Sequence, residues 1–332
     1  MPGPILVTGG AGFVGSHLID LLGAEGAELV AWRRPGGNDP AMNIAAPVAH
    51  VASGSVRTSS HVRWQAIDLL DAAQVHRALV DLKPAAIYHC AGAAHVGRSW
   101  EKTTSTLAIN VRGTHHLIEG LRRARVSAKI VIPSSAMVYA SADAPLKEDD
   151  PLVPRSPYAL SKLAQEMLGQ RAIGDGLHVT IARAFNHVGP RQSPFFAASG
   201  FARRIADIEA GRWEPEIAVG NLDARRDLTD VRDTIRAYRL ILERGTTGRA
   251  YNVCSGHAIT IRELLDRLLA RARVPIRVRV DPSRYRPNDT PLLLGDPTRI
   301  QTELGWRPEI PLDRTLDDLL DDWRSRPVGP VA

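Results

Sequence analysis

The chain has 332 residues, of which 44% are hydrophobic and 23% charged, with a net charge of +6 and a pI near 9.6. At about 150 residues per domain, this length predicts two folding units, and the composition excludes a disordered chain. No apolar run is long enough to span a bilayer, and the basic residues are scattered arginines rather than a cluster. We therefore expect neither a membrane nor a nucleic acid as partner, and the positive charge favours a small polyanionic ligand.

The two cysteines, Cys90 and Cys254, lie far apart in the sequence and show no spacing typical of metal ligands. We expect two free thiols in a reducing compartment and no metal site. The first residues carry no basic segment followed by an apolar stretch and a cleavage site, so we expect a cytoplasmic rather than a secreted protein.

The first half of the chain alternates short apolar strands with amphipathic helical segments. The expected strands are residues 5–7, 28–32, 85–89 and 129–132, and a helix over 16–22 follows the first of them. This alternation predicts a parallel sheet with right-handed crossovers. The fold class is therefore α/β, with a Rossmann-like doubly wound parallel sheet and a smaller, interleaved C-terminal substrate lobe.

The pattern changes after Asn186. A stretch rich in Pro, Phe and Gly covers 190–200, and then come an expected helix (201–211), a charged loop (223–230), a strand (250–253) and a helix (261–272). We place the first domain at 1–185 plus about 228–256, and the smaller lobe at 186–227 and 257–328. Residues after Val328 are expected to form a loose tail.

A glycine-rich turn follows the first expected strand. Gly9, Gly12 and Gly15 give a Gly-x-x-Gly-x-x-Gly spacing that opens the helix over 16–22. Glycine permits the tight turn and lets backbone amides approach a pyrophosphate, and the helix N-terminus adds partial positive charge. Because the turn lies between a strand and a helix, it favours a dinucleotide site over a turn without a ligand.

Two arginines follow the second expected strand. An NAD-binding domain usually carries an acidic residue there, which bonds the ribose 2′-hydroxyl, whereas this chain has Arg33 and Arg34. Guanidinium groups pair well with a 2′-phosphate. The sequence therefore predicts NADP(H) as cofactor.

A candidate catalytic group begins at Tyr158. Lys162 lies four residues later, on the same face of an expected helix. An adjacent ammonium and a cationic nicotinamide favour the phenolate and are expected to lower the Tyr158 pKa, so the pair could exchange a proton with a carbinol or carbonyl oxygen. The strand over 129–132 runs into Ser134 and Ser135, and either hydroxyl could bond the same oxygen.

Together these motifs resemble the extended short-chain dehydrogenase/reductase family, and the resemblance covers nearly the whole chain. It implies that Ser135, Tyr158 and Lys162 are catalytic, and that the protein forms a homodimer. Residues 68–69 resemble the adenine contact, 89–93 the strand end under the pyrophosphate, and 110–114 the helix that supports the active site. The implied cofactor contacts are Gly9, Gly12, Phe13, Val14, Arg33, Arg34, Asp68, Leu69, Ala91, Gly92, Ala93, Asn110, Tyr158, Lys162 and His187.

The second half resembles the GDP-mannose branch of that family, which contains GDP-mannose 4,6-dehydratase and GDP-4-keto-6-deoxy-D-mannose reductase. The matching segments are 183–187, 201–205, 219–227 and 286–289. The resemblance implies a nucleotide-diphosphate sugar as substrate, with a GDP-sugar favoured, and it places His187 beside the nicotinamide. The residues implied to hold the nucleotide diphosphate are Asn186, Arg204, Arg226 and Arg286.

One position separates the possible reactions. The dehydratases carry a Glu two residues after the catalytic Ser or Thr, where this chain has Met137, which cannot transfer a proton. We therefore expect NADPH-dependent reduction of a nucleotide-linked 4-keto-6-deoxy sugar, with GDP-4-keto-6-deoxy-D-mannose as first candidate. GDP-mannose 4,6-dehydration and 4-epimerisation of a nucleotide sugar are the alternatives. A non-catalytic NADP-binding regulator is disfavoured by the complete set of Ser135, Tyr158 and Lys162.

Overall fold

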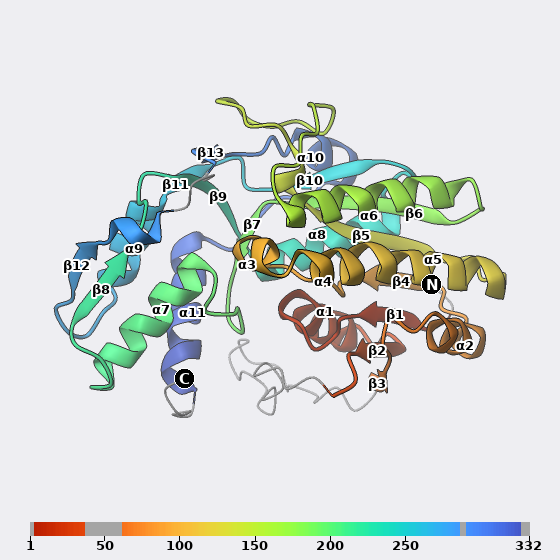
Figure 1. The fold of residues 1–332 in the computed structure, drawn as a ribbon, viewed down its shortest axis with the longest axis horizontal. Helices are drawn as coiled ribbons and strands as arrows, with labels where there is room; N and C mark the ends of the chain where they lie inside the picture. The colour runs from red at the N-terminus through yellow and green to blue at the C-terminus, as the bar shows by residue number, and fades with distance from the viewer. Residues whose placement is uncertain (1–2, 37–61, 286–289, 327–332) are drawn as a thin grey trace. The chain divides into compact units, whose positions relative to one another are not determined.

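The structure is a computed structural model that describes residues 3–36, 62–285 and 290–326. The chain forms two compact units, each built from several segments (Figure 1). Unit 1 comprises Met1–Ala140, Pro151–Arg183 and Ile235–Tyr251, and unit 2 comprises Ser141–Asp150, Ala184–Thr234 and Asn252–Ala332.

The main sheet has seven strands in the order β10-β6-β5-β4-β1-β2-β3. The pairs β1–β2, β1–β4, β2–β3 and β4–β5 are parallel. The order reverses between β1 and β4, as in a doubly wound sheet, so the predicted fold class is confirmed. The strands are β1 (Ile5–Thr8), β2 (Leu29–Arg33), β3 (Val62–Ala66), β4 (Ala86–His89), β5 (Lys129–Ser135), β6 (His178–Ala184) and β10 (Ala250–Val253).

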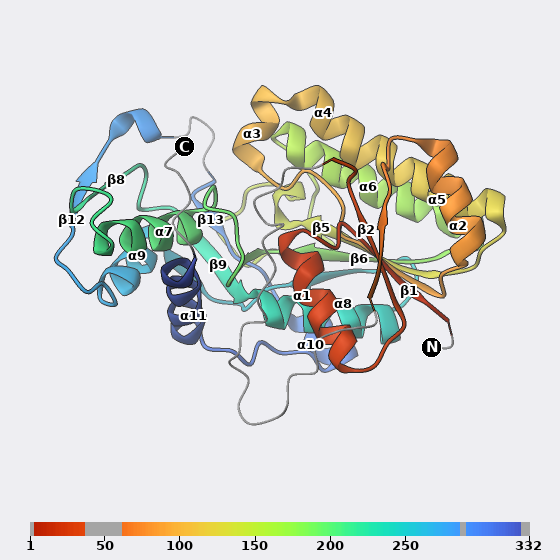
Figure 2. The same cartoon turned by 90° about the horizontal axis from the view of Figure 1, so that it is seen from below.

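Helices cover both faces of this sheet. Figure 2 shows α2, α5 and α6 on one face and α1 and α8 on the other. Leu6 and Ile87 from the strands pack with Leu79 and Leu117 from the helices in one buried apolar cluster. The helical elements are α1 (Phe13–Ala24), α2 (Ala72–Leu82), α3 (Val96–Glu101), α4 (Thr103–Leu107), the π-helical turn η2 (Ala108–Arg112), α5 (Gly113–Ala124), the 3-10 turn η3 (Ala136–Val138), α6 (Pro157–Ile173) and α8 (Val231–Arg244).

Unit 2 has two small sheets. In the larger sheet β9 pairs with β7 and β13 in parallel and with β11 antiparallel, and in the smaller one β8 and β12 are parallel. A second apolar cluster, which includes Ile205, Leu265 and Leu319, lies among its helices. The elements are β7 (Asn186–Val188), α7 (Ala197–Glu209), β8 (Glu216–Val219), β9 (Arg225–Asp230), β11 (Ala258–Thr260), α9 (Ile261–Leu269), β12 (Arg277–Val280), the 3-10 turn η4 (Pro282–Arg284), β13 (Leu292–Leu293), α10 (Thr298–Leu304) and α11 (Leu312–Ser325).

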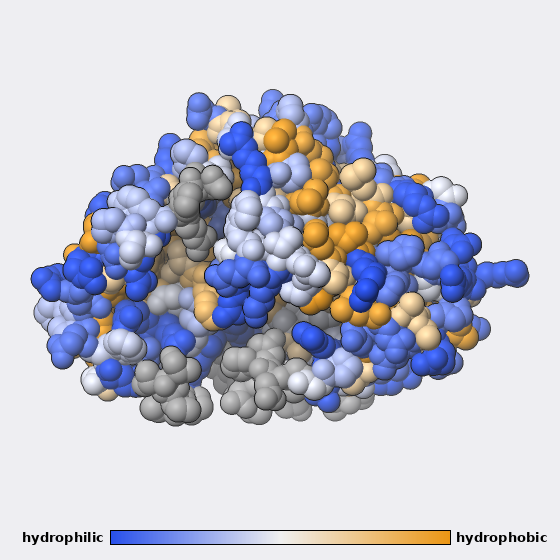
Figure 3. Space-filling view, viewed as in Figure 1, coloured by the Kyte–Doolittle hydropathy of each residue, from blue (hydrophilic) through white to orange (hydrophobic). Residues whose placement is uncertain are grey.

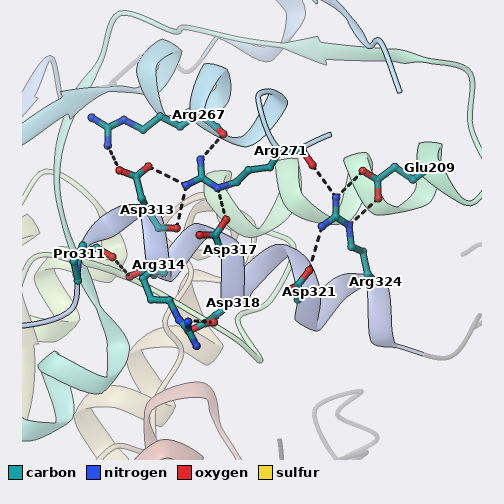
Figure 4. Close-up of polar contacts among 11 residues, drawn as sticks. Glu209, Arg267, Arg271, Pro311, Asp313, Arg314, Asp317, Asp318, Asp321 and Arg324 are labelled. Atoms are coloured by element: carbon teal, nitrogen blue, oxygen red, sulfur yellow. Dashed lines mark hydrogen bonds and ion pairs between the residues drawn. The ribbon is translucent and has the colours of Figure 1, made fainter. Parts of the chain in front are cut away.

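Charged side chains join three helices of unit 2 (Figure 4). Arg271, two residues after the end of α9, donates to Asp313 and Asp317 of α11, and Arg324 of α11 makes two parallel hydrogen bonds of 2.8 Å to Glu209 of α7. Glu209 is the most buried acid of this set, and its bonds to Arg324 lower its pKa. The exposed pairs add little stability, so among these charged contacts Arg324–Glu209 contributes most to holding α11 against α7.

The predicted charged loop over 223–230 is wrong, because β9 occupies most of it. Asp227, Thr229 and Asp230 of β9 are buried, and Asp227 is completely buried. The Asp227 carboxylate accepts hydrogen bonds from the backbone of Ser255, Gly256 and Gly295. Four hydrogen bonds, including one from the Ser255 hydroxyl, offset the cost of burying the carboxylate.

The unit boundaries differ from the predicted domain boundaries in four segments, of which the shortest, 184–185, belongs to unit 2. Ser141–Asp150 belongs to unit 2, because Leu146 N–H donates to Leu294 O and Asp296 N–H donates to Leu146 O. Residues 228–234 also belong to unit 2, where the end of β9 pairs with β7. Residues 252–256 follow them, since Asn252 bonds Leu146 O and Ser255 bonds Asp227.

Among residues 3–36, 62–285 and 290–326, no helix is both long and apolar enough to cross a membrane. The same residues contain no group of His, Cys, Asp and Glu side chains that could hold a metal ion. Cys90 and Cys254 are both free thiols.

Candidate active site

The glycine turn joins β1 to α1. Gly9 has a φ of +66°, and a Cβ there would lie 2.7 Å from the Ala91 backbone. A Cβ on Gly15 would collide with the Gly9 carbonyl oxygen. The turn thus needs glycine for its conformation and for close packing against the loop after β4.

The start of α1 fits an anionic group. Gly12 is the N-cap residue, no side chain caps the helix there, and its first turn has no acidic residue. The first N–H groups of a helix have no partner within the helix and carry partial positive charge. Phe13 and Val14, which were predicted to contact the cofactor, lie in this first turn, so the residues present fit a pyrophosphate.

The predicted adenosine contacts lie at the ends of β2 and β3. Arg33 ends β2 and Arg34 follows it, and both side chains are exposed. β3 runs beside β2, and Ile67 N–H donates to Arg33 O at 2.9 Å. Asp68 and the buried Leu69 come next, so the structure brings these four residues to one edge of the sheet.

Asn110 holds the loop after β4. Its Oδ1 accepts from Ala93 N at 2.7 Å, and its Nδ2 donates to Ala93 O and to Ser161 Oγ. A Cβ on Gly92 would lie 2.8 Å from Asn110 Oδ1. Because the Asn110 side chain is completely buried and bonds protein atoms, it supports the predicted cofactor loop rather than facing a ligand.

Helix α6 carries the tyrosine and the lysine. Ser156 caps the helix by accepting from Ala159 N, and Pro157 occupies the first turn. Tyr158 is therefore fixed at the start of the helix, and Lys162 lies one turn later. Both side chains are buried, and Lys162 Nζ donates to Pro133 O at 2.7 Å.

The structure separates the two serines that end β5. Ser134 Oγ donates to Glu166, whereas Ser135 is hydrogen-bonded to Tyr158. Ser135 Oγ also accepts from Met137 N–H at 3.2 Å, which caps the turn η3. This geometry favours Ser135 over Ser134 as the hydroxyl that acts with Tyr158.

Burial dominates the protonation of the tyrosine. It raises the pKa of the Tyr158 phenol, and the hydrogen bond to Ser135 only partly lowers it. Burial thus outweighs the one group found to lower the Tyr158 pKa, and the lowering expected from Lys162 together with a cationic nicotinamide stays a prediction. Burial lowers the pKa of Lys162 to about 8, while Cys90 and Glu166 act to raise it. At neutral pH the site therefore contains a neutral phenol and an ammonium.

A buried ion pair lies beneath these groups. Arg183 of β6 donates to both carboxylate oxygens of Glu166 of α6, with Nη2–Oε2 at 2.8 Å, and both side chains are almost fully buried. Arg183 Nη1 donates to the Tyr139 hydroxyl at 3.0 Å. Because Glu166 also accepts from Ser134, the pair joins α6, β5 and β6 near Ser135.

The remaining predicted residues lie in unit 2. Asn186 is exposed, and His187 donates from Nδ1 to Phe185 O at 3.2 Å. Burial lowers the His187 pKa, which keeps the ring neutral. Arg204 stacks on Trp213, with 4.0 Å from its Cζ to the ring centroid.

Arg226 belongs to β9, and its Nη1 donates to Arg225 O and Thr290 O. Arg286 lies outside the described residues. The structure thus gives Arg226 structural contacts without testing its predicted role toward the substrate.

Sequence reasoning missed Gln165 and its 2.7 Å bond to Thr114, a residue that it placed only within the helix supporting the active site. Gln165 lies three residues after Lys162, so helical periodicity could have placed it on the lysine's face. Its partner Thr114 lies 51 residues earlier in the sequence, and no local pattern connects the two residues.

Comparison with known proteins identifies the family. A family model described as GDP-mannose 4,6 dehydratase matches residues 6–319. A GDP-6-deoxy-D-mannose reductase from Pseudomonas aeruginosa is 38% identical over 247 residues, which cover 73% of this chain and 81% of that protein. A GDP-mannose 4,6-dehydratase from Yersinia enterocolitica is 26% identical, with 95% of this chain and 92% of that protein covered.

Solved structures agree. The structure of RMD from Pseudomonas aeruginosa complexed with NADPH matches with a TM-score of 0.80 and 33% identity, covering 97% of this chain and 99% of that one. A UDP-glucose 4-epimerase from Thermus thermophilus in complex with NAD matches with a TM-score of 0.82 and 27% identity, with the same coverage. The fold is that of the extended short-chain dehydrogenase/reductase class. Within this class, the chain belongs to the GDP-mannose 4,6-dehydratase family, which confirms the resemblance seen in the sequence.

Proposed function

We propose that this protein is an NADPH-dependent reductase of a nucleotide-linked 4-keto-6-deoxy sugar, with GDP-4-keto-6-deoxy-D-mannose as first candidate. The similarity to the GDP-6-deoxy-D-mannose reductase supports this assignment. The observation that carries it is Met137, which occupies the turn η3 directly after Ser135, where a dehydratase needs an acid or base.

The site can perform the proton transfer that reduction requires. NADPH supplies the hydride when it is bound. Tyr158 donates its phenolic proton to the developing alkoxide oxygen, and Ser135 donates a hydrogen bond to the same oxygen. Burial keeps the phenol protonated, as an acid must be before the reaction, and the Lys162 ammonium adds positive charge nearby.

The reaction class can be tested directly. Mixed with NADPH and GDP-4-keto-6-deoxy-D-mannose, the protein should consume the two in equal amounts. Mixed with GDP-mannose and NADP⁺, it should form no 4-keto-6-deoxy product, because Met137 cannot promote loss of water. The products are separated by chromatography. Formation of the 4-keto product from GDP-mannose would establish the dehydratase alternative, and interconversion of C4 epimers without net NADPH use would establish the epimerase.

The cofactor preference rests on Arg33 and Arg34. Replacing both with Ala should weaken NADPH binding by several-fold to about a hundredfold, because each charged hydrogen bond to the 2′-phosphate is worth about 1.5–3 kcal/mol before discounting for exposure. NADH binding should be spared. Fluorescence titration with each cofactor measures both affinities.

Arg123→Ala is the matched control, since Arg123 is exposed and lies in the last turn of α5, which leads to the amino end of β5, whereas Arg33 lies at the carboxyl end of β2. It should leave both affinities unchanged. If the unaltered protein binds NADH and NADPH equally well, the arginines do not select the cofactor.

Unit 1 is the proposed NADP-binding domain, and unit 2 is proposed to bind the nucleotide sugar. Asn186, Arg204, Arg226 and Arg286 remain the candidates for holding the nucleotide diphosphate, because guanidinium groups suit bidentate contacts with phosphate. His187 is proposed to lie beside the nicotinamide. Titration of GDP into the Arg226→Ala variant and into the unaltered protein measures the contribution of Arg226 to binding the nucleotide diphosphate.

A second copy of this chain is the proposed partner, and the cytoplasm is the proposed location. The outer face of α3 and α6 exposes Trp100 at 55%, Leu160 at 50% and Met167 at 65%, and the half-buried Leu163 and Ala164 complete a helical stripe with them. Figure 3 shows hydrophobic side chains gathered over α6. A continuous apolar face of this kind is typical of an interface between subunits. The mass of the protein in solution measures the assembly.

A further inference from the structure

A chain of buried polar side chains leads away from Lys162. Lys162 Nζ donates to Gln165 Oε1 at 3.0 Å, and Gln165 Nε2 donates to Thr114 Oγ1 at 2.7 Å. Thr114 Oγ1 lies 2.8 Å from Nε2 of His89, whose Nδ1 lies 2.9 Å from Thr8 Oγ1. All four side chains beyond Lys162 are buried, with exposures of 0–1%. A polar chain with so little access to water must satisfy its hydrogen bonds internally.

The direction of each bond is fixed by one hydroxyl. Thr114 Oγ1 donates its only hydrogen to Asn110 O at 2.6 Å, so it accepts from both Gln165 and His89. Gln165 must therefore present its amide to Thr114 and its carbonyl oxygen to Lys162. The opposite orientation would place an NH₂ group against the ammonium and leave two donors without acceptors.

The far end of the chain is consistent with this direction. His89 carries its hydrogen on Nε2, which leaves Nδ1 to accept from the Thr8 hydroxyl, and Thr8 Oγ1 accepts from Ala91 N–H at 3.2 Å. Burial lowers the pKa of His89 to about 3, so the ring is neutral and holds one hydrogen. This series of hydrogen-bonded side chains thus runs from the loop after β4 to the catalytic helix, and each of its hydrogen bonds has one donor and one acceptor.

Few other groups act on the lysine. Cys90, directly after β4, raises the Lys162 pKa only as a thiolate, and burial raises its own pKa to about 12, so it is a neutral thiol where Lys162 titrates. Glu166 lies on the same helix and is paired with Arg183, and the Tyr158 phenol is neutral. Among residues 3–36, 62–285 and 290–326, the oxygens that accept directly from Lys162 are Pro133 O and Gln165 Oε1, and only the second belongs to a side chain.

We propose that Gln165 is a positioning residue that keeps Lys162 charged and oriented for the reaction, and that Thr114 fixes Gln165 in the orientation this requires. The proposal rests on the proposed function for the role of Lys162. Removing the Gln165 oxygen would leave a buried ammonium with one acceptor fewer, and burial would then favour the uncharged amine more strongly. Adding a carboxylate in its place would have the opposite effect.

The protein is well suited to a direct test, because it contains five lysines, and Lys83, Lys102, Lys129 and Lys147 are exposed. With lysine isotope-labelled at Cε, nuclear magnetic resonance follows each side chain through a pH titration. The Lys162 signal is the one that disappears in Lys162→Arg. In the unaltered protein it should titrate near pH 8.

Gln165→Met should move this titration down by about one pH unit or more, since a hydrogen bond to a charged group is worth about 1.5–3 kcal/mol. Gln165→Glu should move it up. Thr114→Val should move it down, because Gln165 loses the acceptor that orients its amide. Gln170→Met, on the same helix but exposed and bonded to Gly248 O, should leave it unchanged.

Circular dichroism establishes which variants fold. If Gln165→Met does not fold, the Lys162 titration in Thr114→Val tests the proposal. An unchanged Lys162 titration in either folded variant overturns the proposal, and so does an equal shift in Gln170→Met. The titration needs no substrate, so it is independent of the reductase assay. A protein that shows the shifts but does not reduce the ketosugar would retain the role of Gln165 and lose the proposed function.

Discussion

Tyr158→Phe is expected to lower turnover of the ketosugar by about 10²–10⁴-fold, which is the usual contribution of a general acid. The phenol is the only group of the site that we assign to give a proton to the substrate oxygen. Binding of NADPH should be largely retained, because the glycine turn and the start of α1 are unaffected. Steady-state rates and a fluorescence titration with NADPH separate the two effects.

Tyr88→Phe is the matched control. Tyr88 is a buried tyrosine of β4 whose pKa is raised mainly by burial and then by Glu243, and we assign it no part in the reaction. Its replacement should leave turnover nearly unchanged. If the two variants had similar activity, Tyr158 would not be the acid, and the reductase mechanism described above would be wrong.

Breaking the Arg183–Glu166 pair should cause the largest loss of stability in unit 1. Replacing either residue with Leu leaves a charge buried without a partner, which costs about 3–5 kcal/mol of the free energy of unfolding. The double replacement Glu166→Leu/Arg183→Leu should lose less than the sum of the single ones, because it leaves no charge behind. Urea unfolding followed by circular dichroism measures all three.

The control for this pair is Arg122→Ala, which removes an ion pair with Glu119 on the surface of α5. Exposed pairs of this kind contribute little, so its stability should stay close to that of the unaltered protein. Single replacements at Arg183 and Glu166 that were no more harmful than Arg122→Ala would show that the buried pair does not hold α6 to β6.

The sequence predicted the part of the fold that depends on local patterns. Three features each have their sequence signal within a few consecutive residues: the strand β1, the glycine turn after it, and the helix that carries Tyr158 and Lys162. β9 gave no such signal, since Arg225–Asp230 is mostly charged and becomes a strand only because distant segments pair with it. The same reason explains Ser141–Asp150, whose partners lie more than a hundred residues later.

The site shows the same division. The types of residue at Ser135, Tyr158 and Lys162 indicated the chemistry, but the choice between Ser134 and Ser135 depended on Glu166, which is 32 residues away from Ser134. The direction of the Tyr158 pKa depended on burial, which no local pattern reveals. Roles in binding the nucleotide sugar were assigned by resemblance to a family, and these are the assignments that experiments on unit 2 must test.

The π-helical turn η2 fixes the number of residues that join α4 to α5. Gly113 N–H bonds Ala108 O, five residues back, so the turn holds one residue more than an α-helix would need. Each residue of a helix rotates the chain by about 100°, so deleting one here would turn α4 by that angle relative to α5. Asn110 could then no longer meet both Ala93 and Ser161. Surface loops of this protein can gain or lose residues over time, whereas this helical segment has to be inherited at constant length.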